Sequence, residues 1–503
     1  MPTLITDLPL ELLPNLLAPL VRRQDLYNVC LVCRAWCSVG QAQLYRWIRL
    51  FGRDLAIASV LFQVLADVPR LARLVKRLEV RVYPLSNSVK QRRAMEELAI
   101  RMLRNCSNVE ELVWTRKGSL TDDVFETIVT LPRLRSFELN AHTNLSPGSW
   151  SASHLVNLPR LRSLSLILPD RNVVDILPSF LARQRELAHL AYPDDPLGGP
   201  LLEELSILCR ESTVINDRTM SSIIPHLANC SLRSLGLAGC AKLTGTPLLA
   251  LLPSLPRLKN LALEACNLDP SFYRLAAPSL TRLDSLKITH PGPNHPTLPD
   301  FFPALETLLE QTRLRAFTLY YSGASAGGRR EWPTVSPGFI ENLTRSIGAS
   351  LRKFELSGVL IDLDSVETLA RGSRGIRDLV LHLGETFDLA HLNACFATLT
   401  ELRSLHVLSQ RADVTPDNVL ELAQQCSPTL RQIGLRNRVW ILRRTIIQDD
   451  DEGDREPRVK IRFIETAAAF GAFRRNRYGA EEDVDLEADL DADERSSSED
   501  ESE

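Results

Sequence analysis

The sequence lacks any run of about 18 uninterrupted apolar residues, the length that a membrane-spanning helix needs. Its closest candidate, Leu4 to Val21, is interrupted by polar residues and prolines, namely Asp7, Pro9, Glu11, Pro14, Asn15 and Pro19. This stretch also lacks the positively charged start and the small-residue cleavage site of a secretory signal. We therefore expect neither a membrane partner nor export, and we expect the protein in the cytoplasm, the nucleus or both.

Signatures of catalysis and of cofactor binding are also missing. The nine histidines do not combine with a nucleophile and a carboxylate in a recognisable motif, and no phosphate-binding GxxxxGK(S/T) pattern occurs. Cys30, Cys33 and Cys37 have a metal-like spacing, but residues three and seven apart on a helix simply share a face, and the nearest histidine is His142. We expect no enzyme activity, no cofactor and no metal, and the scattered cysteines favour reduced thiols.

Charge is unevenly distributed along the chain. The net charge is −3, but residues 481–503 hold thirteen acidic residues against Arg495 alone. The other 480 residues carry 58 basic and 49 acidic groups, a net charge of about +9. Because the segment 481–503 has almost no bulky apolar residues, we expect it to be a disordered acidic tail.

A six-residue pattern recurs through the middle of the chain: an apolar residue, two variable positions, an apolar residue, one variable position and an apolar residue. About thirteen copies occur, mostly 25 to 31 residues apart, from Val75-Leu78-Val80 to Leu430-Ile433-Leu435. The last two apolar positions point to one face of a short strand, and the remaining residues can form a helix that covers them. Stacked units share a core, which predicts an α/β solenoid. An ordinary α/β domain with fortuitous leucines is the alternative.

The pattern resembles the leucine-rich repeat. Cys240 and Cys266 lie three residues beyond the last strand leucine, where that family places an asparagine or cysteine, although most other copies lack either residue. The resemblance implies a horseshoe over residues 51–437, with a concave parallel sheet and convex helices. An open last repeat would expose its core, so residues 438–480 are predicted to form a cap, with strands at 439–442 and 459–463 around the acidic loop 449–456.

Residues 1–50 have the pattern of a helical module. Leucines at 12, 13, 16, 17 and 20 recur at steps of three and four, and Asp25 is predicted to start a second helix that continues through Trp36. Two helices of this length cannot bury so much apolar surface between themselves. They need a partner surface, which is either the start of the repeats or another protein.

This module resembles the F-box motif, through Leu8-Pro9 followed by Glu11-Leu12, the apolar ladder through Leu16 and Leu20, and the segment VCRAW that ends at Trp36. In that family the module docks on the Skp adaptor, which binds a cullin scaffold. The resemblance implies a substrate-recognition adaptor of a Skp–cullin–F-box ubiquitin ligase. The residues implied to fill or support the Skp interface are Leu8, Pro9, Leu12, Leu16, Leu20, Leu26, Val29, Val32 and Trp36.

Two alternatives to the adaptor function remain at this point. The module can be a helical cap of the repeats with no outside partner. The chain can also be a leucine-rich-repeat scaffold or GTPase regulator that has no association with a ubiquitin ligase.

A basic residue directly follows the first apolar position in ten of the thirteen copies. Because equivalent residues of parallel strands stack about 4.8 Å apart, a ladder is predicted along one margin of the sheet. Arginine there can hold an acidic or phosphorylated protein substrate through charge-assisted hydrogen bonds. The candidates are Arg315, Arg352, Arg377, Arg403 and Arg431.

Other interpretations of this basic row stay open. Long basic side chains can cover the edges of the core while their charge is merely solvated. Nucleic-acid binding is not favoured, because the sequence has no concentrated basic patch interleaved with aromatic residues. The acidic tail 481–503 is an expected competitor for the same surface.

Overall fold

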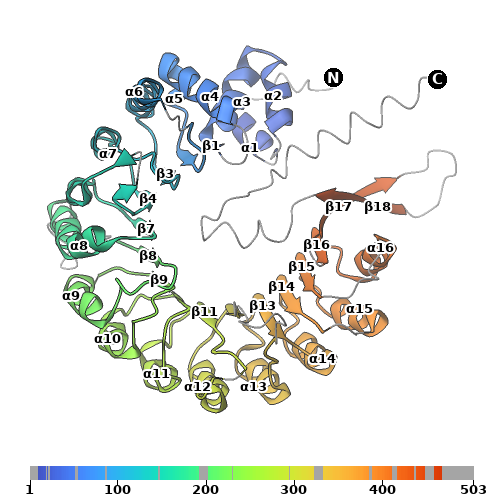
Figure 1. The fold of residues 1–503 in the computed structure, drawn as a ribbon. Coiled ribbons are helices and arrows are strands. Elements are labelled where there is room, and N and C mark those ends of the chain that lie inside the picture. Colours follow the sequence, from blue (N-terminus) through green and yellow to red (C-terminus); the bar gives the residue numbers. More distant parts are fainter. Residues whose placement is uncertain are drawn as a thin grey trace. The chain divides into compact units, whose positions relative to one another are not determined.

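The chain folds into a series of strand and helix units, which a computed structural model describes at residues 10–18, 20, 23–50, 55–84, 88–145, 148–191, 202–228, 230–293, 295–321, 332–384, 388–409, 416–435, 438–447 and 458–466. Two compact units divide the chain, residues 1–207 and residues 208–503, and each contains parallel strands and a row of helices (Figure 1). The tail 481–503, the loop 449–456, Leu8 and Pro9 lie outside the described residues.

The first unit begins with three short helices and continues as strand–helix repeats. Its helices are η2 (Leu10–Leu12), α1 (Leu13–Leu17), α2 (Arg23–Cys30), α3 (Arg34–Arg46), α4 (Leu55–Asp67), α5 (Pro69–Ala72), α6 (Val89–Asn105), α7 (Asp122–Val129), η3 (Ala152–Asn157) and α8 (Arg171–Ala191). Its strands are β1 (Trp47–Leu50), β2 (Arg77–Val80), β3 (Glu111–Trp114), β4 (Ser136–Asn140), β5 (Asn144–Leu145), β6 (Gly148–Ser149), β7 (Ser163–Ile167) and β8 (Glu204–Leu208), which ends at the division.

The second unit repeats the alternation of strand and helix and ends in a hairpin. Its helices are α9 (Asp217–Leu227), α10 (Gly245–Leu251), η4 (Leu252–Ser254), α11 (Ser271–Ala276), η5 (Ala277–Ser279), α12 (Leu298–Glu310), α13 (Pro337–Ile347), α14 (Leu363–Gly372), α15 (Leu389–Ala397) and α16 (Pro416–Gln425). Its strands are β9 (Ser234–Ala238), β10 (Asn260–Glu264), β11 (Ser285–Thr289), β12 (Ala316–Tyr320), β13 (Lys353–Leu360), β14 (Asp378–His382), β15 (Ser404–Leu408), β16 (Gln432–Leu435), β17 (Arg438–Ile447) and β18 (Arg458–Thr466).

The strands follow one another in chain order. In the first unit β1, β2, β3, β4 and β7 pair in parallel, and in the second unit β9 to β16 do the same. The helices that connect parallel neighbours, such as α12, α13 and α14, form a row on one face of the sheet (Figure 1). Among the described residues, no helix lies on the other face of the sheet.

The apolar positions of the repeat pattern form the core. In the copy at β4, Leu134, Phe137 and Leu139 are at most 2% exposed, and the copy at β12 is buried in the same way. Side chains alternate across a strand, so the variable positions between them point to the helix-free face. This arrangement confirms the α/β repeat architecture that the leucine spacing predicts.

Residues 47–50 form a strand that was not expected. β1 pairs in parallel with β2, Trp47 opposite Arg77 and Ile48 opposite Leu78. Tyr45, Ile48 and Leu50 fit the six-residue pattern, so the repeat begins one unit earlier than the leucine copies indicate. The module therefore runs directly into the sheet.

The helix expected from Asp25 through Trp36 is wrong, because α2 ends at Cys30 and α3 begins at Arg34. No glycine or proline marks the break, and Cys33 is fully extended there. The turn lets α3 fold back on α2 at Gly40, where a Cβ would lie 2.8 Å from the Cys30 Sγ. Close packing of the two helices therefore overrides the helical pattern of the sequence.

The second unit ends in a hairpin longer than the two short strands expected. β17 pairs antiparallel with β16 from Arg438 to Ile441, and β18 pairs antiparallel with β17 along its whole length. The hairpin thus covers the last parallel strand. It also continues beyond that strand, because β16 has four residues and β17 has ten.

Candidate functional site

The helices α1 to α3 leave large apolar side chains at their surface. Leu12 is 46% exposed, Leu16 49% and Val32 59%. All three are among the residues predicted to bind a partner. The described part of the first unit provides no cover for them, so this surface is the first candidate site.

The other predicted residues of the module lie beneath that surface. Leu26 and Val29 are buried where α2 packs on α3, and Leu20 and Trp36 are half-buried. Leu26 and Val29 thus support the packing of the helices, while Leu20 and Trp36 remain partly exposed. Leu8 and Pro9 have no described position.

Tyr27 and Leu31 are also exposed and are not among the predicted residues. Tyr27 is 51% exposed and Leu31, in the turn after α2, is 67% exposed. They are four residues apart, a spacing that places two residues one above the other in a continuous helix. That spacing is a usable signal, but the break after Cys30 that exposes Leu31 is set by packing.

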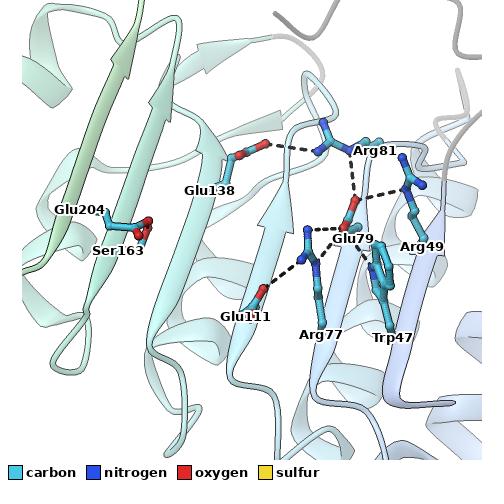
Figure 2. A network of polar contacts seen from close by, with 9 residues as sticks. All are labelled: Trp47, Arg49, Arg77, Glu79, Arg81, Glu111, Glu138, Ser163 and Glu204. Atoms are coloured by element: carbon cyan, nitrogen blue, oxygen red, sulfur yellow. Dashed lines mark hydrogen bonds and ion pairs between the residues drawn. The ribbon is translucent and has the colours of Figure 1, made fainter. Parts of the chain in front are cut away.

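A network of charged side chains surrounds Glu79 on the helix-free face of the first unit (Figure 2). The Glu79 side chain is 2% exposed. Its Oε1 accepts hydrogen bonds from Trp47 Nε1 at 3.0 Å and from Arg77 Nε at 2.8 Å. Its Oε2 lies 3.3 Å from Arg81 Nε and 3.5 Å from Arg49 Nε.

Two further carboxylates bind the outer sides of these arginines. Arg77 Nη1 lies 3.3 Å from Glu111 Oε2, and Arg81 Nη2 lies 3.5 Å from Glu138 Oε1. Burial raises the pKa of Glu138, and the nearby Arg81 opposes that rise. Three guanidinium groups thus meet three carboxylates, and the network leaves little net charge for a ligand.

Trp47 is a member of this network whose side chain is exposed to solvent. Its side chain is 47% exposed although Glu79 fixes its indole N–H, and the Arg77 guanidinium lies 4.7 Å from the ring centroid. That distance is in the range of a cation–π contact. The network therefore holds an exposed aromatic residue in a fixed orientation at the first strand of the sheet.

The predicted basic row exists as a ladder of backbone hydrogen bonds. From Lys259 onward, each residue of the row precedes its strand and donates its N–H to the carbonyl of the row residue before it. The distances in the second unit are 2.7 Å for Arg315 to Asp284, 2.8 Å for Arg352 to Arg315, 2.7 Å for Arg377 to Arg352, 2.7 Å for Arg403 to Arg377 and 2.8 Å for Arg431 to Arg403.

The side chains of the row are not equivalent. Arg352 Nη1 donates to the carbonyl of Leu351 at 3.0 Å, and Arg377 binds the Glu401 carboxylate through Nε and Nη2 at 3.0 and 2.9 Å. Arg315 Nε lies 4.0 Å from Asp284. These three arginines are therefore wholly or partly engaged within the chain.

Arg403 and Arg431 end the row. Both are exposed, and within the described residues no side-chain hydrogen bond or ion pair joins either one to a neighbour. The hydrogen bond from Arg377 lowers the pKa of Glu401, to which Arg352 and Arg403 add through space. Among the described residues, Arg403 and Arg431 are thus the two candidates without a close side-chain partner, although Arg403 acts on the Glu401 carboxylate through space.

A cavity of about 360 Å³ lies in the second unit at the carboxyl ends of β10 and β11, and Cys266, Tyr273 and His290 line it. His290 is 1% exposed, and its Nδ1 accepts the N–H of Gly292 at 3.0 Å. Burial lowers the pKa of His290 to about 4. The imidazole is therefore neutral near pH 7, and Phe301 and Phe302 pack against it.

Metal binding and membrane insertion find no support in the parts of the chain with a described position. No group of three or more His, Cys, Asp or Glu side chains is arranged there to hold a metal ion. None of the helices in those parts has the length and apolar character needed to cross a bilayer.

No protein-family model matches the sequence, and no curated protein is similar to it. Among solved structures, the chain is similar to a chain of the Rad7–Elc1 complex from yeast, with 14% identity, a TM-score of 0.39, and coverage of 83% of this chain and 97% of that one. It is also similar to the leucine-rich repeat-containing protein LegL7 from Legionella pneumophila, with 12% identity, a TM-score of 0.36, and coverage of 60% and 93%.

Proposed function

We propose that this protein is a substrate-recognition adaptor whose module α1 to α3 docks on a Skp-type subunit and, through it, on a cullin of a ubiquitin ligase. In this proposal the repeats bind the protein substrate. The observation that carries it is the exposed apolar surface of Leu12, Leu16 and Val32, at positions where the F-box resemblance places the Skp interface.

The size of the exposed side chains supports a protein partner. Tyr27 and Leu31 add to the surface, so five large apolar residues between positions 12 and 32 are 46% exposed or more. Apolar patches of this kind mark protein–protein contacts. Leu13, Leu17, Leu26 and Val29 are at most 8% exposed, and they give the surface a packed support.

The repeats supply the other half of the proposal. Arg403 and Arg431 are the exposed members of the basic row that make no side-chain hydrogen bond or ion pair with another described residue, which suits an acidic or phosphorylated substrate segment. Trp47 and its arginine neighbours are a second contact candidate on the helix-free face of the first unit, because tryptophan and arginine are enriched among residues that dominate binding energy.

The test is the affinity of the full-length protein for a purified Skp-type adaptor, measured by calorimetry, followed by capture of a cullin. The double variant Leu12→Asp, Leu16→Asp places two charges in the contact. We expect it to weaken adaptor binding by at least about 100-fold, which corresponds to about 2.8 kcal/mol.

The matched control is Leu275→Asp on α11, because Leu275 is 64% exposed and lies in the second unit. It should bind the adaptor as the unaltered protein does. Absence of adaptor binding by the unaltered protein, or equal loss in the control, contradicts the proposal and favours a repeat scaffold without a ligase.

A further inference from the structure

Arg403 and Arg431, at the end of the basic row, lie at the same margin of the sheet as the basic residues of the terminal hairpin. Arg403 and Arg431 stand on adjacent strands, joined by a 2.8 Å backbone hydrogen bond from the Arg431 N–H to the Arg403 carbonyl. Neighbouring strands lie about 4.8 Å apart, so the two positive charges repel one another. An anion between them would relieve that repulsion.

The terminal hairpin brings more basic residues to the same margin of the sheet. The last register pair of β16 and β17 is Gln432 with Ile441, and the next N–H, of Leu442, donates to the Arg431 carbonyl at 2.8 Å. Beyond that point residues 443–447 pair only with residues 458–462. The hairpin therefore overhangs the sheet on the side where the row lies.

The sequence of this overhang is entirely without acidic residues. It contains Arg443, Arg444, Arg458, Lys460 and Arg462. Arg443 and Arg462 are direct register partners. We call Arg403, Arg431 and the overhang, residues 443–447 and 458–462, the cationic margin.

The chain carries a segment of complementary charge within reach of this margin. Residues 481–503 hold thirteen acidic residues and one arginine. β18 ends at Thr466, which pairs with Val439, itself the partner of Gly434 on β16. The intervening residues 467–480 span up to about 50 Å when extended, several times the distance between neighbouring strands.

We propose that the acidic segment 481–503 docks on the cationic margin of its own chain. Such a tether supplies an effective concentration on the order of millimolar, so weak individual ion pairs suffice for occupancy. The docking does not require the adaptor function. Its consequence rests on the proposed function: an acidic substrate that uses Arg403 and Arg431 must displace the segment.

The experiment measures binding of a labelled synthetic peptide with the sequence of residues 481–503 to the full-length protein by fluorescence anisotropy. In one variant, the acidic residues of the segment are changed to their amides. This variant should bind the peptide at least about tenfold more tightly than the unaltered protein, because its own segment no longer competes.

Two pairs of arginine substitutions in that amide variant locate the contact. Arg403→Gln with Arg431→Gln should weaken peptide binding at least about fivefold. Arg274→Gln with Arg371→Gln removes the same charge from exposed positions on α11 and α14 and should leave the affinity unchanged. Added salt should weaken the peptide contact, since the charges involved are exposed.

Three outcomes overturn the proposal. One is equal peptide affinity for the unaltered protein and the amide variant, and another is equal loss in the two arginine pairs. The third is tighter peptide binding when only the acidic residues of the loop 449–456 are changed to amides. That result identifies the loop as the occupant of the cationic margin. Adaptor binding is measured separately through Leu12 and Leu16, so the two proposals can fail independently.

Discussion

Large apolar side chains are exposed in the module of helices α1 to α3 but buried in the repeats. Leu16 and Leu31 in the module are 49% and 67% exposed, whereas Phe137 and Phe317 in the repeats are fully buried. A repeat receives an apolar face from the next repeat, whereas no described residue of the first unit covers Leu16 or Leu31 in this way. Side chains that are buried or paired within the chain should therefore govern the free energy of unfolding. Side chains that remain exposed should govern the binding of partners.

The largest expected effect separates these two roles. Phe137→Ala removes a buried ring that meets Phe125 edge to face, with ring centroids 5.9 Å apart, and should lower the free energy of unfolding by about 4 kcal/mol. Leu16→Ser in the module should change it by less than about 0.5 kcal/mol. Urea unfolding followed by circular dichroism measures both, and similar losses would remove the distinction.

The second prediction asks whether charges in the repeats obey the same rule. Glu79→Gln leaves Arg49, Arg77 and Arg81 without their shared carboxylate, and should cost about 3 kcal/mol of unfolding free energy. The value lies at the low end for a buried ion pair because the arginines reach solvent. Glu111→Gln is the control, since Glu111 is half exposed and its pair with Arg77 should contribute below about 1 kcal/mol.

Much of the fold follows from leucine spacing alone. Apolar positions at fixed intervals predict β2, β3, β4 and β7 to β16, because only a strand followed by a covering helix buries them. β1 was not predicted because the first pattern residue, Tyr45, lies within α3, and Ile48 and Leu50 follow directly after that helix. The turn at Leu31 was not predicted because no local sequence signal determines it. It depends on the contact of Gly40 with Cys30.

The sequence predicts where the residues of the candidate sites lie in the repeats, but not which contacts their side chains make. Spacing places Arg352 and Arg377 in one row with Arg403, and the backbone ladder has that order. The contacts of their side chains depend on residues elsewhere in the sequence, such as Glu401. The location of Glu401 follows from the register of neighbouring repeats. The Glu79 network likewise joins residues from positions 47 to 138, which no local pattern connects.

The third prediction concerns buried imidazoles in the repeats. Burial lowers the pKa of His290 and of His406 to about 4, while each is near 6.5 in an unfolded chain. Between these values the unfolded state binds more protons, so the free energy of unfolding falls as the pH decreases from about 6.5 to 4. Each histidine should contribute about 2 kcal/mol of loss between pH 7 and pH 5.

His290→Phe tests this contribution, because a phenyl ring suits the contacts with Phe301 and Phe302. Urea unfolding at pH 7 and at pH 5 should show a pH dependence smaller than that of the unaltered protein by about 2 kcal/mol, with the His406 part remaining. An unchanged difference between the two pH values would show that His290 takes up its proton in the folded protein.

The smallest expected effect tests close packing on the helix-free face of the second unit. A Cβ at Gly434 on β16 would lie 2.2 Å from His406 Nδ1, on the neighbouring strand β15. Gly434→Ala therefore forces the buried imidazole to move and should cost about 1 to 2 kcal/mol of unfolding free energy. Gly338→Ala on α13 is the matched control, because no atom lies within 4 Å of a Cβ there. In a helix that substitution should be neutral or stabilising by up to about 1 kcal/mol. If both substitutions behave alike, the helix-free face tolerates change as the module surface does, and the contrast between the two regions is limited to the buried core.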